Sequence, residues 1–334
     1  LSALVDLFSK CGKIHDACKV FEIMPERDIV SWNAVIGGFA GQKLHHATFH
    51  MFKLMTNQGL TPDCFTLGIV LKAATNLRSV RTIHALTCKL GLEHHVSLRG
   101  SLIDSYVKRG TMDYAQKLYD FSNPKDVMYS TMLLCGYDKH CKNDAALTFM
   151  RGLRVANVKH DNVIFCSMLH ICAKMALLLG GKQIHALALK NCQHDVALGN
   201  ALVDVYAKSG AVGDARKAFD DMAEKNVITW TTMIGGYGIN GRGAEAVALY
   251  EKMDNPSDVT LLSVLSACSH SGLPVAATGC IKSMIKRHNV LPHDKHLACV
   301  ADIFARRGYL REALRLIHVV GSTANSILAA YRIY

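Results

Sequence analysis

The stretch Asn200–Met222, NALVDVYAKSGAVGDARKAFDDM, decides the fold because it contains a complete helical hairpin. Apolar side chains recur at helical spacing in both of its halves, first at Leu202, Val205 and Tyr206 and then at Ala215, Ala218, Phe219 and Met222. Ser209-Gly210 interrupts the pattern between the halves, as a tight turn does. The stretch therefore predicts two short amphipathic helices joined by a turn.

The same order of small, apolar, aromatic, basic and glycine positions recurs along the chain. It is present in LSALVDLFSKCGKIHDACKVFEIMPER from Leu1 and in SLIDSYVKRGTMDYAQKLYDF from Ser101. A hairpin this short cannot bury its apolar stripe alone, so it needs neighbours built in the same way. With 334 residues the chain exceeds the usual size of one core, and the internal similarity favours a repeat array over several globular domains.

The boundaries between units are 31 to 36 residues apart, and they fall at Asp28, Asp63, His95, Asp126, Asp161, Asp195, Asn226, Ser257 and His293. The spacing alternates and does not hold one value. No linker rich in proline, glycine or serine separates the units. The sequence therefore predicts an all-α fold, a continuous right-handed stack of helical pairs over residues 1–320, without strands.

Composition limits the possible functions. Lys and Arg number 38 against 27 Asp and Glu, a net charge of +11 that favours a polyanionic partner without proving one. The twelve cysteines include many at apolar helix positions, which indicates small core residues in a reducing compartment. No C-x-x-C pair and no H-x-E triplet occurs, so neither a metal nor another cofactor is predicted. No apolar run is long enough to cross a membrane.

Several phrases resemble the pentatricopeptide repeat family, and within it the plant PLS subclass, in which P-, L- and S-type repeats alternate. They are DIVSWNAVIGGFA at Asp28, the Asn200–Met222 hairpin, GGKQIHALALK at Gly180 and LLSVLSACSHSGL at Leu261. The resemblance covers about ten repeats over residues 1–320, the first incomplete, and residues 321–334 resemble the start of a C-terminal E-type extension. A tetratricopeptide array is the nearest alternative, but its constant period and its W-x-x-L-G-x-x-Y signature are missing.

The resemblance implies sequence-specific binding of single-stranded RNA, with one nucleotide bound per repeat. In each repeat the base-reading pair is one residue in the first turn of the first helix and the residue that closes the repeat. The implied pairs are Ser2 with Asp28, Asn33 with Asp63, Gly100 with Asp126, Thr131 with Asp161, Cys166 with Asp195, Asn200 with Asn226, and Thr231 with Ser257.

Hydrogen-bonding patterns give each pair an expected base. Guanine offers adjacent donors, which a carboxylate accepts, and uracil offers one donor between two acceptors, which suits an amide beside a carboxylate. Asn33 with Asp63 should favour U, the Thr131 and Ser2 pairs G, the Asn200 pair a pyrimidine, and the Thr231 pair weakly a purine. The Gly100 pair lacks one polar member, and Gly68 with His95, Cys166 with Asp195, Leu262 with His293, and Ala298 depart from the readable combinations. The expected site is 5′-G-U-n-n-G-n-Y-R-n-n-3′.

Two further sets of residues have a structural alternative. Apolar residues just before the base-reading positions are expected to sandwich the bases, although core packing is the alternative; they are Val30, Met128, Val163, Ala197 and Ile228. Cations that end the first helix of short hairpins would compensate the helix dipole or form a weak phosphate-binding stripe; they are Lys10, Lys108, Arg109, Lys208, Arg306 and Arg307. Helix capping is the alternative for the polar base-reading residues themselves.

The leading hypothesis is a specificity factor for C-to-U editing of transcripts in mitochondria or chloroplasts. A factor for RNA splicing, stability or translation is the first alternative, and a protein-binding helical scaffold of the tetratricopeptide kind is the second. A zinc deaminase needs H-x-E and P-C-x-x-C, and neither occurs. The chain is therefore not expected to be an enzyme, and a deaminase domain would come from a missing C-terminal part or from a protein of the editing complex.

Overall fold

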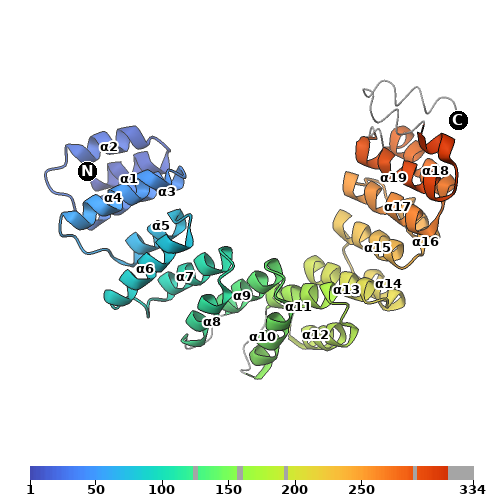
Figure 1. Ribbon diagram of the computed structural model, residues 1–334, viewed down its shortest axis with the longest axis horizontal. Coiled ribbons are helices and arrows are strands. Elements are labelled where there is room, and N and C mark those ends of the chain that lie inside the picture. Colours follow the sequence, from blue (N-terminus) through green and yellow to red (C-terminus); the bar gives the residue numbers. More distant parts are fainter. Residues whose placement is uncertain (123–126, 156–160, 192–194, 289–291, 315–334) are drawn as a thin grey trace. The chain divides into compact units, whose positions relative to one another are not determined.

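A computed structural model describes residues 1–122, 127–155, 161–191, 195–288 and 292–314 (Figure 1). The described residues form nineteen complete helices and contain no strand, as the sequence predicts. None of these helices combines the length and the apolar character required to span a membrane. The chain divides into two compact units, Leu1–Lys159 and His160–Tyr334, and each is described by itself.

Unit 1 contains five helical pairs, and every pair has an odd-numbered first helix and an even-numbered second helix. They are α1 (Ser2–Lys10), α2 (Ile14–Glu22), α3 (Ile29–Gly41), α4 (His45–Asn57), α5 (Cys64–Ala73), α6 (Leu77–Lys89), α7 (Val96–Lys108), α8 (Met112–Asp120), α9 (Val127–Lys139) and α10 (Asn143–Val155).

Unit 2 continues the same alternation. Its helices are α11 (Asn162–Lys174), α12 (Leu178–Asn191), α13 (Val196–Lys208), α14 (Val212–Asp221), α15 (Val227–Ile239), α16 (Gly243–Tyr250), α17 (Asp258–Ser271), α18 (Pro274–Lys286) and α19 (Asp294–Arg306). Within each unit the first helices pack side by side in chain order, and each second helix packs against its own first helix and the following one (Figure 1). Residues 321–334, the expected extension, lie outside the described residues.

The predicted hairpin at Asn200–Met222 is formed by α13 and α14, and Gly210 makes its turn with φ +79°. Glycine adopts this left-handed conformation without steric cost. The equivalent turns after α3, α9 and α11 use side-chain-bearing residues, Lys43, Cys141 and Ala176, at φ +58°, +54° and +50°. Those three turns carry the strain that Gly210 avoids.

Aromatic contacts hold consecutive hairpins together. Trp32 is 1% exposed and meets the ring of Phe21 edge-on, with ring centroids 4.7 Å apart. Trp230 packs on Phe219 in the same way at 5.2 Å. Both tryptophans thus lie between a second helix and the next first helix.

A polar contact recurs at the interface between a second helix and the next first helix. The Tyr106 hydroxyl lies 2.8 Å from Nδ1 of His84, and the Tyr206 hydroxyl lies 2.8 Å from Nδ1 of His185. His185 follows His84 by 101 residues and Tyr206 follows Tyr106 by 100, which is the length of three hairpins. The same half-buried contact in both units supports a repeating cycle of three hairpins.

Candidate nucleic-acid interface

The residues that close the repeats cap the first helices. Side chains at six boundaries accept the backbone N–H three residues later at 2.7–3.3 Å; they are Asp28, Asp63, Asp161, Asp195, Asn226 and Ser257. Helix capping is therefore a correct account of these residues. It does not exhaust their hydrogen-bonding capacity, because a carboxylate has about four acceptor sites. Asp126 lies outside the described residues.

The structure brings Asn33 and Asp63 together between α3 and α5. Nδ2 of Asn33 donates to Oδ1 and Oδ2 of Asp63 at 3.2 and 3.4 Å. Burial alone raises the pKa of Asp63, but hydrogen bonds from Thr66 and Asn33 outweigh burial and lower it. Asp63 is therefore a carboxylate at neutral pH, and this half-buried pair presents an amide beside an acceptor.

Two other pairs are also linked, one directly and one through a third residue. The Ser2 hydroxyl donates to Oδ1 of Asp28 at 3.4 Å, and the backbone N–H of Ser31 is the main cause that lowers the pKa of Asp28. The hydroxyls of Thr231 and Ser257 are joined through Thr260, which lies 2.7 Å from the first and 3.0 Å from the second. Both pairs therefore belong to hydrogen-bonded groups that span consecutive first helices.

Thr131 and Asn200, two further predicted base-reading residues, have different surroundings. Thr131 donates to the carbonyl of Val127 at 3.0 Å in unit 1, and its predicted partner Asp161 belongs to unit 2. Asn200 is half-buried, and its Oδ1 has no hydrogen-bond partner among the described residues, whereas Asn226 is exposed.

In two repeats without a readable pair, side chains that were not predicted contact the predicted residues. Gly100 is buried because the ring of Tyr129 covers it; a Cβ there would lie 3.0 Å from Cε1 of Tyr129, whose hydroxyl donates to the Val96 carbonyl. Asp195 accepts Nδ2 of Asn162 at 2.8 Å. Asn162 is thus a polar neighbour of Asp195 that the sequence did not single out.

An exposed apolar residue occupies the second position of most first helices. The five predicted at this position, Val30, Met128, Val163, Ala197 and Ile228, are all exposed, so the core alternative is wrong for them. The structure adds Phe65, which is 70% exposed, and Val259, which is 62% exposed. Sequence reasoning missed both, although each follows its boundary residue at the same offset of two. Exposed apolar side chains at this position can cover the face of a base without selecting it.

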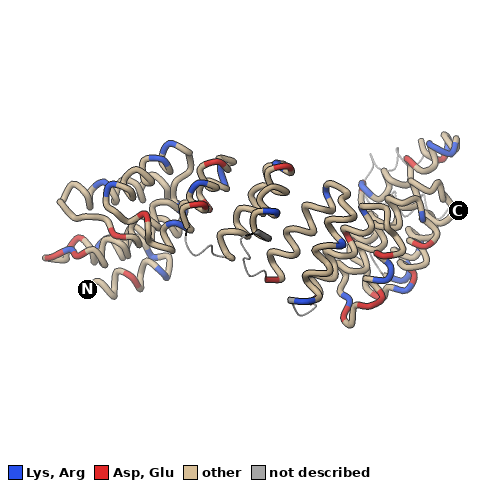
Figure 2. Tube along the Cα trace, turned by 90° about the horizontal axis from the view of Figure 1, so that it is seen from below, with Lys and Arg blue, Asp and Glu red and all other residues tan. Residues whose placement is uncertain are grey.

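The cations proposed as a phosphate stripe are compensated. Lys10, Lys108, Lys208 and Arg306 each pair with an aspartate one turn earlier, at 2.6–2.8 Å: Asp6, Asp104, Asp204 and Asp302 respectively. Lys/Arg and Asp/Glu segments accordingly lie close together within each unit (Figure 2). Arg109 donates to the carbonyls of Ser105 and Ala74, and Arg307 to that of Ser271. These side chains thus have structural partners of their own, and a phosphate would have to compete with them.

Buried hydroxyls form a further set that the sequence analysis passed over. Thr66, Thr229 and Thr260 are fully buried at the third position of α5, α15 and α17. Each accepts the backbone N–H of its boundary residue in a capping box. The signal was present in the sequence as D-x-x-T, N-x-x-T and S-x-x-T across the predicted boundaries.

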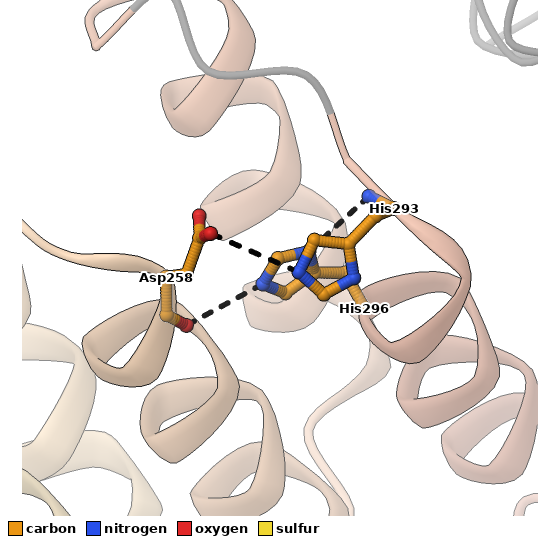
Figure 3. Close-up of side chains that lie close together, drawn as sticks. All are labelled: Asp258, His293 and His296. Atoms are coloured by element: carbon orange, nitrogen blue, oxygen red, sulfur yellow. Dashed lines mark hydrogen bonds and ion pairs between the residues drawn. The ribbon is translucent and has the colours of Figure 1, made fainter. Parts of the chain in front are cut away.

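Asp258, His293 and His296 are the described residues that come nearest to a metal-binding set (Figure 3). Their donor atoms lie within 4.8 Å of one another, whereas ligands around a tetrahedral zinc ion lie about 3.3 Å apart. The His293 N–H donates to Nδ1 of His296, which leaves the proton of neutral His296 on Nε2, facing the Asp258 carbonyl at 3.5 Å. A metal at Nε2 would displace that proton to Nδ1, against the N–H of His293. The cluster therefore does not fit a metal ion in this arrangement.

Helical hairpins stacked through their first helices define the class of this chain, an α-solenoid of repeats. The family models for the PPR repeat match residues 1–29, 200–227, 228–255 and 259–289, and the model for the PPR repeat family matches residues 27–76. The chain therefore carries pentatricopeptide repeats, as the resemblance implied.

Curated relatives agree with this assignment. One pentatricopeptide repeat-containing protein of Arabidopsis thaliana is 42% identical over 327 residues, which are 95% of this chain and 58% of the relative. A second, described as mitochondrial, is 32% identical and covers 95% of this chain and 51% of its own length. A third, described as chloroplastic, is 33% identical and covers 93% of this chain and 40% of its own length. The chain spans about half the length of the curated relatives that it matches.

A solved structure has the same fold. The pentatricopeptide repeat protein PPR10, crystallised in complex with an 18-nucleotide psaJ RNA element, matches with a TM-score of 0.73 at 16% sequence identity. The match covers 95% of this chain and 49% of PPR10. The predicted α-solenoid is thereby confirmed.

Proposed function

We propose that this chain binds single-stranded RNA in a sequence-specific manner, with one nucleotide bound per repeat. The observation that carries the proposal is the Asn33–Asp63 pair, in which an amide lies against a carboxylate across two consecutive first helices. Such a pair offers both a donor and acceptors to the Watson–Crick edge of a base. The solved RNA complex of PPR10, a protein of the same fold, supports RNA as the ligand class.

The exposed apolar residues supply the second element of the proposal. Val30 and Phe65 occupy the second positions of α3, which carries Asn33, and of α5, which Asp63 caps, and both side chains are exposed. A base held between such side chains has its faces covered by apolar groups while its edge meets the polar pair. Stacking of this kind contributes about 1–3 kcal/mol per base with aromatic side chains such as Phe65. Unpaired bases are accessible in this way, whereas the edges of paired bases are already occupied.

The proposed biological role is that of a specificity factor for C-to-U editing of an organellar transcript. The mitochondrial and chloroplastic descriptions of relatives support an organellar destination. The three-hairpin cycle, repeated in the His84–Tyr106 and His185–Tyr206 contacts, supports the alternating subclass that the sequence resembles. The chain's own part in editing would be recognition, and a partner or a further domain would supply the deaminase. A factor for splicing, stability or translation would use the same recognition.

The test is a quantitative binding experiment with synthetic RNAs at fixed salt. One RNA carries the expected 5′-G-U-n-n-G-n-Y-R-n-n-3′ site, a second carries the same bases in permuted order, and a third is the expected RNA annealed to its complement. The single strand with the expected site should bind at least tenfold more tightly than the permuted RNA and the duplex, which corresponds to about 1.4 kcal/mol of discrimination. Equal affinity for all three would refute sequence-specific single-strand binding.

A further inference from the structure

We infer that Thr66 is a positioning residue for base recognition, because its buried hydroxyl fixes the orientation of the Asn33 amide. This inference rests on the proposed function. Oγ1 of Thr66 lies 2.6 Å from Oδ1 of Asn33 and 2.8 Å from Oδ1 of Asp63. Thr66 is fully buried at the third position of α5, so its hydroxyl contacts the pair from the protein interior and cannot itself contact a base.

The hydrogen-bonding capacity of the three side chains determines the orientation of the amide. The backbone N–H of Asp63 donates to Oγ1 of Thr66, which leaves the single hydroxyl proton for an acceptor. Oδ1 of Asn33, at 2.6 Å, is the nearer acceptor for this proton, and Oδ1 of Asp63 lies 2.8 Å away, while Nδ2 of Asn33 donates to the Asp63 carboxylate. A flipped amide would set its oxygen against a carboxylate and its N–H₂ group against the hydroxyl proton. Thr66 and Asp63 together therefore allow one orientation.

The fixed orientation leaves a defined pattern for the base. Asn33 keeps one N–H and one lone pair of Oδ1 that neither Thr66 nor Asp63 uses. Uracil presents the N3–H donor beside a carbonyl acceptor, so a fixed amide matches it with two hydrogen bonds. An amide free to rotate also matches cytosine, whose edge reverses donor and acceptor. We therefore assign the preference for U over C at this repeat to the Thr66 hydroxyl.

The rest of the chain shows the same association between the two positions. Five of the base-reading residues predicted in the first turn of a first helix are serine, threonine or asparagine. For four of them, the third residue of the next first helix has a buried hydroxyl: Ser31 after Ser2, Thr66 after Asn33, Thr229 after Asn200 and Thr260 after Thr231. No hydroxyl of serine or threonine follows Gly68, Gly100, Cys166 or Leu262, where the residues are Leu98, Tyr129, Leu198 and His296. Thr131, followed by Ile164, is the exception.

The two closest contacts of this kind are those of Thr66 and Thr260. Thr260 lies 2.7 Å from the hydroxyl of Thr231, which also has the Val227 carbonyl at 2.7 Å. When Thr231 donates to that carbonyl, Thr260 donates to Thr231, and a lone pair of Thr231 remains for the base. Asn200 differs, because its Oδ1 has no partner among the described residues. The absence of a hydroxyl partner on Oδ1 agrees with an expected preference for either pyrimidine.

The test compares Thr66→Val, which removes the hydroxyl at nearly constant shape, with Thr66→Ser, which keeps it. Thr87→Val is the matched control, because Thr87 is equally buried but donates to Ile83 within its own helix at 2.9 Å. RNAs that differ only as U or C at the Asn33 repeat are compared. We expect Thr66→Val to lose roughly tenfold of the U-over-C preference, about the net worth of one hydrogen bond. Thr66→Ser and Thr87→Val should keep it.

A second measurement needs no RNA. In the free protein labelled with ¹⁵N-asparagine, the hydrogen bonds to Thr66 and Asp63 should shift the two side-chain proton signals of Asn33 from the values of exposed asparagines. We expect both signals to move towards the exposed values in Thr66→Val and to stay in place in the two other variants. Unchanged Asn33 signals in Thr66→Val, or an equal loss of preference in Thr87→Val, would overturn the inference and leave the proposed function intact. A wild-type chain with shifted Asn33 signals but no base preference would overturn the proposed function instead.

Discussion

Replacing Asn33 with threonine should change the base preferred at the second position of the expected site from U towards G. The variant keeps Asp63 and Thr66, and the chain already contains a threonine in this setting, because Thr231 lies 2.7 Å from Thr260. The amide that donates to the base is lost, whereas the carboxylate that accepts the donors of guanine stays ionised. The loss of one donor and the gain of one acceptor correspond to about 1 kcal/mol each, and hence to a U-to-G change of roughly thirtyfold.

The assay is a competition between RNAs that carry U or G at that single position, measured at one salt concentration since phosphate contacts make affinity salt-dependent. The control RNAs differ as U or G at the position opposite the Leu262 repeat, which the sequence predicts to be unreadable. Asn33→Thr should leave the preference at that control position unaltered. An unchanged preference at the Asn33 position, or equal changes at both positions, would refute the assignment of this residue to base recognition.

Three further substitutions test separate features. Phe65→Ala should weaken RNA binding about five- to tenfold whichever base is present, because the stacking surface is lost. The melting temperature should hardly change because the ring is exposed, and a large drop would contradict this prediction. Ala176→Gly should stabilise unit 2 by about 1 kcal/mol in denaturant unfolding, because Ala176 has φ +50°; destabilisation would contradict it. Burial and the neighbouring His293 lower the pKa of His296 in the folded chain. As pH falls below about 6.5, the unfolded chain therefore binds a proton on His296 before the folded chain does, and the folded state loses stability. His296→Thr should therefore reduce the loss of stability between pH 7 and pH 5, and an identical pH profile would contradict this prediction.

Helical period and turn residues were sufficient to predict the hairpins. Apolar spacing and Gly210 placed α13 and α14 within a few residues of where they lie. The turns at Lys43, Cys141 and Ala176 have no glycine at the left-handed position, yet the repeat period still predicted the helices around them. These turns form because stacking on neighbouring hairpins compensates for their local strain. Repetition thus predicted the fold where a single unit would have been ambiguous.

The interface was predictable only in part, because its chemistry depends on contacts between consecutive hairpins. The offset of two residues from each boundary correctly placed Val30 and Ile228 on the surface, and would also have found Phe65. The partners of the cations were missed, although an aspartate four residues before Lys208 is visible in the sequence. The contact between Thr66 and Asn33 joins residues 33 positions apart, which no local pattern reports.

The proposed recognition of one base depends on two hairpins and not on one. Asn33 belongs to α3, Thr66 belongs to α5 and Asp63 caps the N-terminus of α5, so their 2.6–3.2 Å contacts exist only while the two helices stay packed. A substitution that separates α3 from α5 should therefore abolish base preference before it unfolds either hairpin. Trp32, buried against Phe21, holds the other side of α3 in the same way. Under the proposed function, selectivity for bases therefore depends on the packing of first helices, and a new preference at one repeat should require a compatible residue in the next.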